Sequence, residues 1–162
     1  MNLEDVGHDL QRLIDAHPHL FCGKAPAVHS YVTAGWYGLL DKLCRDLESL
    51  LGPESCAAFS VIQIKEKFGT LRFYYRFGEE EDLHVDLLSP EGRVHLVCGR
   101  GEPASGEDLQ TRIRELVGQA CAASETACEQ CGALGQLRNL GGYLVTLCDP
   151  HLAERSARKD QE

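Results

Sequence analysis

The chain has 162 residues, of which 43% are apolar and 25% charged, so a wholly disordered protein is excluded. Sixteen Lys and Arg residues against 25 Asp and Glu give a net charge of -9, which favours basic partners and opposes binding to nucleic-acid phosphates. The opening segment MNLEDVGHDLQRLID has no signal-peptide pattern, and no stretch approaches the roughly 18 apolar residues of a membrane span. We therefore predict a cytoplasmic protein, whose eight cysteines serve as metal ligands or core residues rather than as disulfides.

Helical spacing of apolar residues predicts two helices in the first third of the chain. The first covers residues 3–14 and ends near HPH at residues 17–19, because proline disfavours helix in the residue before it. The second covers residues 39–51, where leucines dominate the apolar stripe. Gly52 and Pro53 follow this stripe and predict the end of the second helix.

Two antiparallel hairpins are predicted in the middle of the chain. Residues 57–77 are rich in branched and aromatic side chains, and Gly69 marks the turn between the two strands. Alternation along the second strand places apolar and aromatic residues on one face and the basic residues on the other. After an acidic segment, LHVDLL and GRVHLVC flank the turn sequence SPEG and predict the second hairpin.

A third helix over residues 109–121 leads the chain to Cys128. The fold class predicted from these elements is α+β, with helices packed on a small antiparallel sheet and a zinc finger at the C-terminus. We accordingly divide the chain into a core domain over residues 1–127 and a metal module over residues 128–155. The tail over residues 156–162 has no apolar face and is predicted to fray.

Four potential metal ligands lie in two pairs: Cys128 and Cys131 in CEQC, and Cys148 and His151 in CDPH. Two residues separate the members of each pair, so both can reach one ion from a tight turn, as tetrahedral zinc requires. The glycine-rich stretch between the pairs suffices for a hairpin, and CDPH is typical of the first turn of a helix. This layout resembles a treble-clef zinc finger, so we predict one structural Zn²⁺ whose four positions are all filled by protein. Unmetallated or disulfide-bonded cysteines are the alternative.

Three segments together resemble a family of short uncharacterised proteins from bacteriophages and bacterial genomes. They are GWYGLLDKLC at residues 35–44, QIKEKFGTLRFYY at residues 63–75, and the CEQCG and TLCDPH of the metal module. The resemblance implies a glycine-tryptophan helix, a KEKFG hairpin and a terminal four-ligand metal module. It is thin over residues 79–108, and it implies no activity.

Basic residues cluster in the first hairpin, and with one tyrosine they form a candidate nucleic-acid surface: Lys65, Lys67, Arg72, Tyr74 and Arg76. The alternative is a solvated strand face whose charges are neutralised by the neighbouring acidic segment. Residues 128–162 carry four bases and five acids, so the metal module itself lacks a phosphate-binding stripe. Nucleic-acid binding by a phage-type accessory protein is therefore the second functional hypothesis.

Acidic residues follow the first hairpin and form a candidate partner-binding surface: Glu79, Glu80, Glu81, Asp82 and Asp86. Such a surface can dock on a basic active-site or nucleotide-binding cleft, since charge complementarity speeds association and selects the partner. The leading hypothesis is a non-enzymatic protein-binding module, of the kind represented by immunity proteins and antitoxins that neutralise a toxin-like partner. The alternative reading of these acids is an ordinary solvated loop and strand edge.

Catalytic motifs are not evident in the sequence. It contains neither a G-x-S-x-G nucleophile elbow nor a G-x-x-x-x-G-K-[ST] phosphate loop, and GRGEP at residues 99–103 matches neither the phosphate loop nor a dinucleotide fingerprint. An enzyme of unrecognised type is consequently the third hypothesis, and no catalytic residues are predicted.

Overall fold

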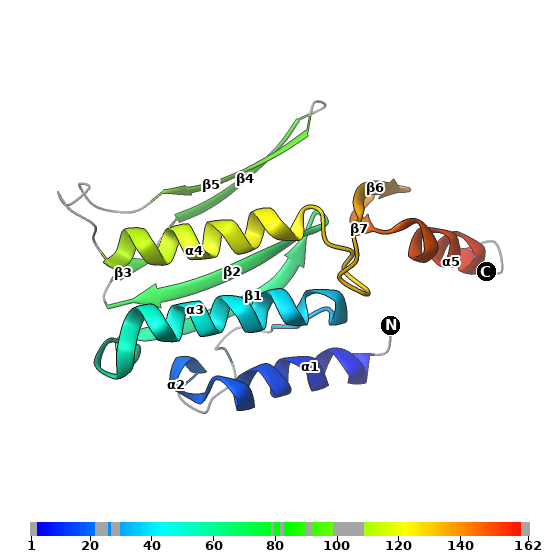
Figure 1. Ribbon diagram of the computed structural model, residues 1–162. Coiled ribbons are helices and arrows are strands. Elements are labelled where there is room, and N and C mark those ends of the chain that lie inside the picture. Colours follow the sequence, from blue (N-terminus) through cyan, green and yellow to red (C-terminus); the bar gives the residue numbers. More distant parts are fainter. Residues whose placement is uncertain are drawn as a thin grey trace.

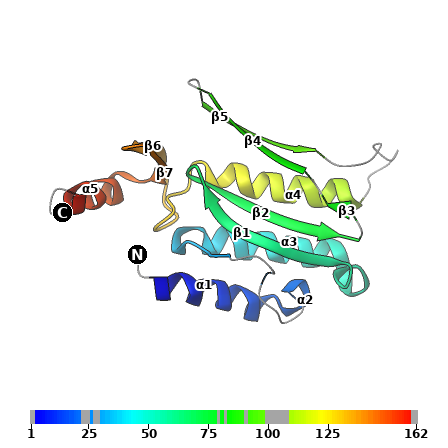
Figure 2. The ribbon, with the colours of Figure 1, turned by 180° about the vertical axis from the view of Figure 1, so that it is seen from behind.

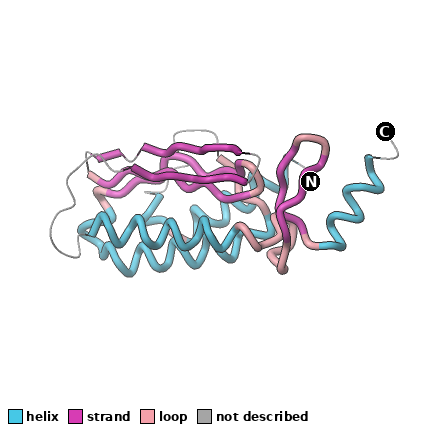
Figure 3. Tube along the Cα trace, turned by 90° about the horizontal axis from the view of Figure 1, so that it is seen from above, coloured by secondary structure: helices cyan, strands magenta, loops and turns pink. Residues whose placement is uncertain are grey.

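Helices and strands form two layers in the computed structural model, with helices along one side and strands along the other (Figure 3). The structure describes residues 3–21, 26, 30–78, 80–81, 83–89, 92–98 and 109–159. The helices are α1 (Leu3–Ala16), α2 (Pro18–Phe21), the 3-10 helix η1 (Ala34–Trp36), α3 (Tyr37–Cys56), α4 (Leu109–Ser124) and α5 (Asp149–Lys159). The strands are β1 (Phe59–Lys67), β2 (Thr70–Phe77), β3 (Glu80–Glu81), β4 (Leu83–Ser89), β5 (Gly92–Cys98), β6 (Gln136–Leu140) and β7 (Tyr143–Leu147). The predicted α+β class is confirmed.

The first predicted hairpin forms the central sheet. Strands β1 and β2 pair antiparallel, and the short strand β3 extends the sheet at the far end of β2. The turn is tight because Phe68 and Gly69 both have positive φ angles, of 56° and 75°. Glycine adopts this conformation at no steric cost, which explains its position in KEKFG. Strands β4 and β5 form the second predicted hairpin as a separate two-stranded sheet.

Helix α3 is the longest helix among the described residues, and it contains the predicted helix stop. Gly52 has φ 65° and ψ 174°, which are not helical angles, and one further turn follows from Pro53 to Cys56. The leucine stripe packs toward the sheet, with Leu40, Leu47 and the thiol of Cys44 completely buried. Gly52 thus interrupts the helix as predicted, and the chain then turns into β1.

Helix α4 lies beside α3 and packs on β2 (Figures 1 and 2). Ser124, at the end of α4, accepts a hydrogen bond from the backbone N–H of Leu71 at 2.9 Å and donates one to the carbonyl of Cys121 at 2.6 Å. Its hydroxyl therefore satisfies the backbone donor of Leu71, a β2 residue that stands opposite Glu66 of β1. The serine joins the helix layer to the sheet through a polar contact inside the core.

The hydrophobic core lies between the two layers, and α1, α2, η1, α3, α4, β1 and β2 all contribute to it. Phe59 and Tyr75 stack across β1 and β2 with ring centroids 5.4 Å apart. Fully buried side chains come from helices and strands alike: Leu13, Leu20, Trp36, Leu40, Leu47, Phe59, Ile64, Leu71, Phe73 and Ile113. Burial of this apolar surface is the main force that holds the core domain together.

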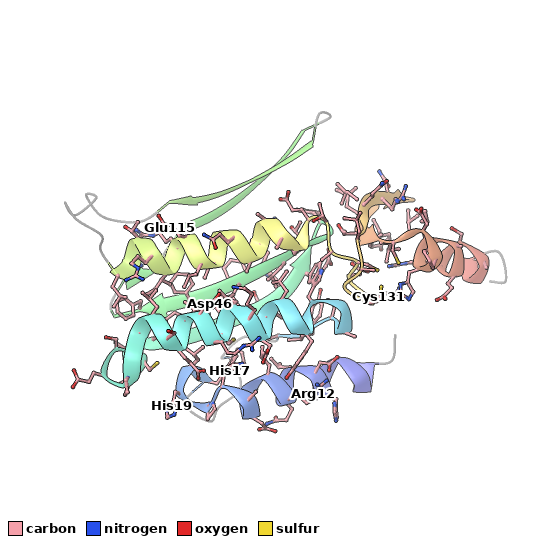
Figure 4. The ribbon with its side chains drawn as sticks, viewed as in Figure 1. Arg12, His17, His19, Asp46, Glu115 and Cys131 are labelled. Carbon is pink, nitrogen blue, oxygen red and sulfur yellow. The ribbon has the colours of Figure 1, made fainter. Side chains whose placement is uncertain are left out.

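A buried histidine links the N-terminal helices to α3. His17 is 3% exposed, and its ring nitrogens lie 2.9 Å from a carboxylate oxygen of Glu48 and 3.1 Å from one of Asp41. Figure 4 shows His17 between α1 and α3. Both partners belong to α3, so the HPH segment that ends α1 also fastens it to the longer helix.

Helix α5 continues to Lys159 and so includes residues 156–159 of the tail that the sequence predicts to fray. The Ser156 hydroxyl donates to the carbonyl of Leu152 at 3.0 Å, a bond that fits a continuing helix. Residues 160–162 lie outside the described residues. In the part of the chain that the structure describes, no helix combines the length and apolar character needed to cross a bilayer.

Candidate metal centre

The four predicted ligands converge on one point beside the core domain. The ligand atoms of Cys128, Cys131, Cys148 and His151 all lie within 4.8 Å of one another. Cys131 and Cys148 have sulfurs 3.8 Å apart, and the Nδ1 atom of His151 is 3.4 Å from the sulfur of Cys128 and 3.2 Å from that of Cys148. Figure 4 shows Cys131 where the metal module meets the core. The predicted ligand set is brought together as a possible metal site.

Donor spacing tests whether a metal ion fits this site. An ion bound tetrahedrally at about 2.0–2.3 Å requires its donors to be separated by about 3.3–3.8 Å, the edge of that tetrahedron. Three of the six donor separations are 3.2, 3.4 and 3.8 Å, close to this requirement, and all six lie within 4.8 Å. The quartet therefore has donors and spacings that are compatible with a four-coordinate ion.

Local structure explains how two turns present the ligands. The first pair lies in a knuckle closed by the hydrogen bond from the Gly132 N–H to the Cys128 carbonyl at 2.8 Å, and Gly132 has φ 75°. Strands β6 and β7 then carry the chain back to Cys148. His151 lies in the first turn of α5, where the N–H of Leu152 bonds the Cys148 carbonyl at 2.9 Å. A knuckle, a hairpin and a helix are the elements that the treble-clef resemblance predicts.

The electrostatics of the quartet favour a thiolate at Cys128. Burial opposes its ionisation, but backbone N–H groups of Cys148, Gln130 and Cys131, together with His151, lower the pKa of Cys128 to about 6. The backbone N–H of His151 also favours the Cys148 thiolate, yet burial and the sulfurs of Cys128 and Cys131 raise the pKa of Cys148. Neighbouring thiolates repel unless a cation lies between them, so this set of groups is suited to hold one.

Cysteines of the core domain differ from those of the module. Burial raises the pKa of Cys121 to about 11 and also raises the pKa of Cys44, so both remain neutral thiols that pack as small apolar groups. None of the six described cysteines forms a disulfide in the structure. Cys22 and Cys98 lie outside the residues whose side chains the structure describes.

Gly35 and Trp36 dock the knuckle on the core. The N–H of Gly35 donates to the Glu129 carbonyl at 3.0 Å, and the indole N–H of Trp36 donates to the Ala127 carbonyl at 2.9 Å. A Cβ on Gly35 would lie 2.1 Å from the carbonyl oxygen of Cys128. Only a glycine therefore permits this approach of the two backbones.

Gly69 provides a second docking point, between the KEKFG turn and β7. Its carbonyl accepts a hydrogen bond from the buried hydroxyl of Thr146 at 2.7 Å. A Cβ on Gly69 would lie 2.7 Å from the side chain of Leu137 and 3.0 Å from the backbone of Val145. The glycine-tryptophan and KEKFG segments thus both contact the metal module. Sequence reasoning missed this role, because no local pattern reports a contact between segments so distant in the chain.

The predicted basic surface is only partly present. The prediction that Arg72 belongs to an exposed surface is wrong, because its side chain is 2% exposed. Its guanidinium donates to the hydroxyl of Thr70 and to the carbonyl of Leu71, which keeps the buried charge hydrogen-bonded. Alternation assigned Arg72 to a strand face, but it did not reveal that this part of the face is covered.

The other residues of that surface are spread over differing environments. Arg76 is exposed, whereas Lys65 and Tyr74 are half-buried and contact each other, with the ammonium 5.2 Å from the ring centroid. Lys67 is half-buried and lies 5.2 Å from the ring of Phe68. These contacts occupy Lys65 and Lys67 within the hairpin, which weakens the nucleic-acid hypothesis.

The predicted acidic surface falls largely outside what the structure describes. Glu80 and Glu81 form β3, and Asp86 lies in β4 opposite His95. Only the backbone is described at these positions, and Glu79 and Asp82 lie outside the described residues. The backbone places β3 next to the end of β2, where Phe77 pairs with Glu80. The acidic segment therefore begins at the end of the sheet opposite the metal module (Figure 1).

The chain matches no protein-family model, and no curated protein or solved structure is significantly similar to it. The resemblance to phage and bacterial proteins therefore stays a prediction from the three motifs. The geometry of the described residues carries the functional argument that follows.

Proposed function

We propose that the quartet holds one zinc ion with a structural role. The observation that carries this proposal is the convergence of three thiols and one imidazole within 4.8 Å, with three of their separations close to the edges expected for tetrahedral zinc. Zinc favours this mixture of sulfur and nitrogen donors, whereas calcium and magnesium favour oxygen. Because protein atoms supply all four donors, no coordination position is left for a catalytic water molecule. The ion would stabilise the module rather than take part in chemistry.

Trp36 provides a direct test of zinc binding. It is the single tryptophan of the chain, and its indole N–H is bonded to the residue before the first ligand. Titration of metal-free protein with Zn²⁺ should change the tryptophan fluorescence and saturate at one equivalent. The variant Cys148→Ser should lose this response, while Cys121→Ser, which changes a core thiol, should keep it. The absence of a fluorescence response, or saturation at two equivalents of Zn²⁺, would contradict the proposal.

The protein is, in this proposal, a non-enzymatic protein-binding module. Support comes from the closed ligand set, from the net charge of -9, and from large apolar side chains that the metal module exposes. Leu134 is 82% exposed, Tyr143 75% and Leu137 44%. Exposed apolar and aromatic groups on an element that a metal ion would hold rigid are suited to contact another protein.

A basic partner fits the charge of the chain. The most specific form of the proposal is an immunity or antitoxin-type inhibitor in the reducing cytoplasm, which covers the basic active-site cleft of a toxin-like protein. The acidic segment from Glu79 to Asp86 would face that cleft. Complementary charge would accelerate association and make its rate fall with rising salt.

Affinity capture tests this function. Zinc-loaded protein immobilised through its C-terminus should recover one partner from a lysate of its native host, and the partner should have an excess of Lys and Arg. Substitution of Glu79, Glu80, Glu81 and Asp82 together by Gln or Asn should slow association. Recovery of no protein would contradict the proposal. Steeply salt-dependent binding to DNA or RNA would contradict it too, and would support the nucleic-acid hypothesis instead.

A further inference from the structure

A cavity of about 460 Å³ lies where the core domain meets the metal module. The core contributes Tyr31, Thr33 and Glu66, and the module contributes residues around the first ligand pair, strand β7 and helix α5. Its volume lies within the range of about 300–1,000 Å³ that is usual for ligand pockets. The cavity is separate from the four metal donors, and neither the metal site nor the acidic segment accounts for it.

Two residues that line this cavity each have one buried polar atom without a hydrogen-bond partner among the described residues. Glu129 is 6% exposed, and its Oε1 accepts a bond from Arg155 at 3.2 Å while its Oε2 has no partner. Thr33 is 3% exposed, and its hydroxyl is likewise without a partner. Buried polar atoms are nearly always hydrogen-bonded, so two unpartnered acceptors in one cavity indicate a bound group that donates.

The charge of the cavity indicates a cation. Three acidic side chains line it, from Glu66, Glu129 and Glu154, against one guanidinium, from Arg155. Among the described residues, only the Cys/His quartet brings three or more ligand atoms within 4.8 Å of one another, so these acidic side chains do not converge on a point. A single metal ion therefore does not fit, whereas a larger cation with several separated donors does.

A guanidinium group has the properties that this cavity requires. It is planar, carries five N–H donors and stacks on aromatic rings, and Tyr31 and Tyr143 line the cavity. We propose that the cavity receives an arginine side chain of the partner protein, which donates to Glu129 Oε2 and to the Thr33 hydroxyl. This inference rests on the proposed protein-binding function and adds a second contact to it, distant from the acidic segment. The exposed ring of Tyr143 would form part of the rim around the inserted side chain.

A small probe tests the cavity without the partner. Nα-acetyl-arginine amide should bind the zinc-loaded protein in a calorimetric or NMR titration, and the neutral isostere Nα-acetyl-citrulline amide should bind at least about tenfold more weakly. Glu129→Gln should weaken the arginine probe by about 30-fold or more, because a hydrogen-bonded charge pair is lost. Thr33→Val should weaken it by about tenfold. Glu54→Gln, an exposed acid outside the cavity, should have no effect.

Zinc content must equal that of the wild type in each variant, so that a change in binding is not a change in folding. Equal binding of the arginine and citrulline probes would overturn the inference. A captured partner whose affinity is the same for wild type, Glu129→Gln and Thr33→Val would also overturn it, and would leave the proposed function intact. Selective binding of the arginine probe with no partner captured would support the guanidinium site and contradict the proposed function.

Discussion

The core domain and the metal module are held together by different forces. The buried cluster of the core draws on α1 to α4 and on β1 and β2, whereas that of the module contains Cys128, Val145, Leu147 and Cys148. Two of the four residues in this apolar cluster, Cys128 and Cys148, belong to the Cys/His quartet. A segment of this size buries too little apolar surface to fold alone, so the proposed zinc ion would take the place of a larger core. The core thus relies on apolar burial, whereas the module would rely on metal coordination.

Removal of a metal ligand should have the largest effect and should be confined to the module. Structural zinc contributes on the order of 10 kcal/mol of apparent binding free energy, so Cys128→Ser should unfold residues 128–159. Hydrogen exchange should show lost protection in β6, β7 and α5 but retained protection in α3. The matched variant Cys121→Ser should leave the protection of the module unchanged. Equal loss of protection in both regions would mean that they are one cooperative unit.

A substitution that creates a cavity in the core should destabilise the core and leave the metal module unaffected. Leu47 is completely buried in α3, so Leu47→Ala should lower the free energy of unfolding of the core by about 2–5 kcal/mol. Because its contacts lie within the core cluster, the zinc affinity of the folded protein should change by less than about twofold. Denaturant unfolding and competition with a chelating dye measure the two quantities. A parallel fall in zinc affinity would show that the core preorganises the ligands.

The contact between the core and the metal module can be tested by substituting two glycines. Gly35→Ala would place a methyl group 2.1 Å from the carbonyl oxygen of Cys128 and 2.6 Å from the backbone nitrogen of Cys131. We expect it to destabilise the protein by about 3 kcal/mol, since backbone atoms must shift. Gly38→Ala meets nothing within 4 Å and should stabilise α3 by about 0.5–1 kcal/mol. Similar effects of the two substitutions on the unfolding midpoint would contradict the observed docking.

The smallest effect is expected at the second docking point. Thr146→Val removes the hydroxyl that donates to the Gly69 carbonyl and should cost about 1–2 kcal/mol. Thr126→Val, an exposed site whose own contact is 3.5 Å long, should change the unfolding free energy by less than about 0.5 kcal/mol. Thermal unfolding of both variants measures the difference. Indistinguishable melting temperatures would mean that this hydrogen bond does not hold the module.

Local patterns predicted the elements well. The leucine stripe of α3, the turn at Gly69 and the four ligands follow from periodicities and spacings of only a few residues, which the sequence displays directly. Gly52 was predicted to stop a helix, and its backbone is not helical there.

Long-range contacts could not be predicted in the same way. The burial of Arg72, the approach of Gly35 to the knuckle and the unpartnered carboxylate oxygen of Glu129 all depend on segments that are distant in the chain. A strand pattern separates two faces but does not say what covers each of them. The composition of the cavity likewise depends on how the module docks on the core, which no single motif encodes.

X-ray absorption at the zinc edge of the metal-loaded protein tests the central claim most directly. The account predicts one zinc ion per chain with three sulfur ligands at about 2.3 Å and one nitrogen ligand at about 2.0–2.1 Å, and with no further ligand. A shell completed by a water oxygen, or one with fewer than three sulfurs, would contradict a closed structural site.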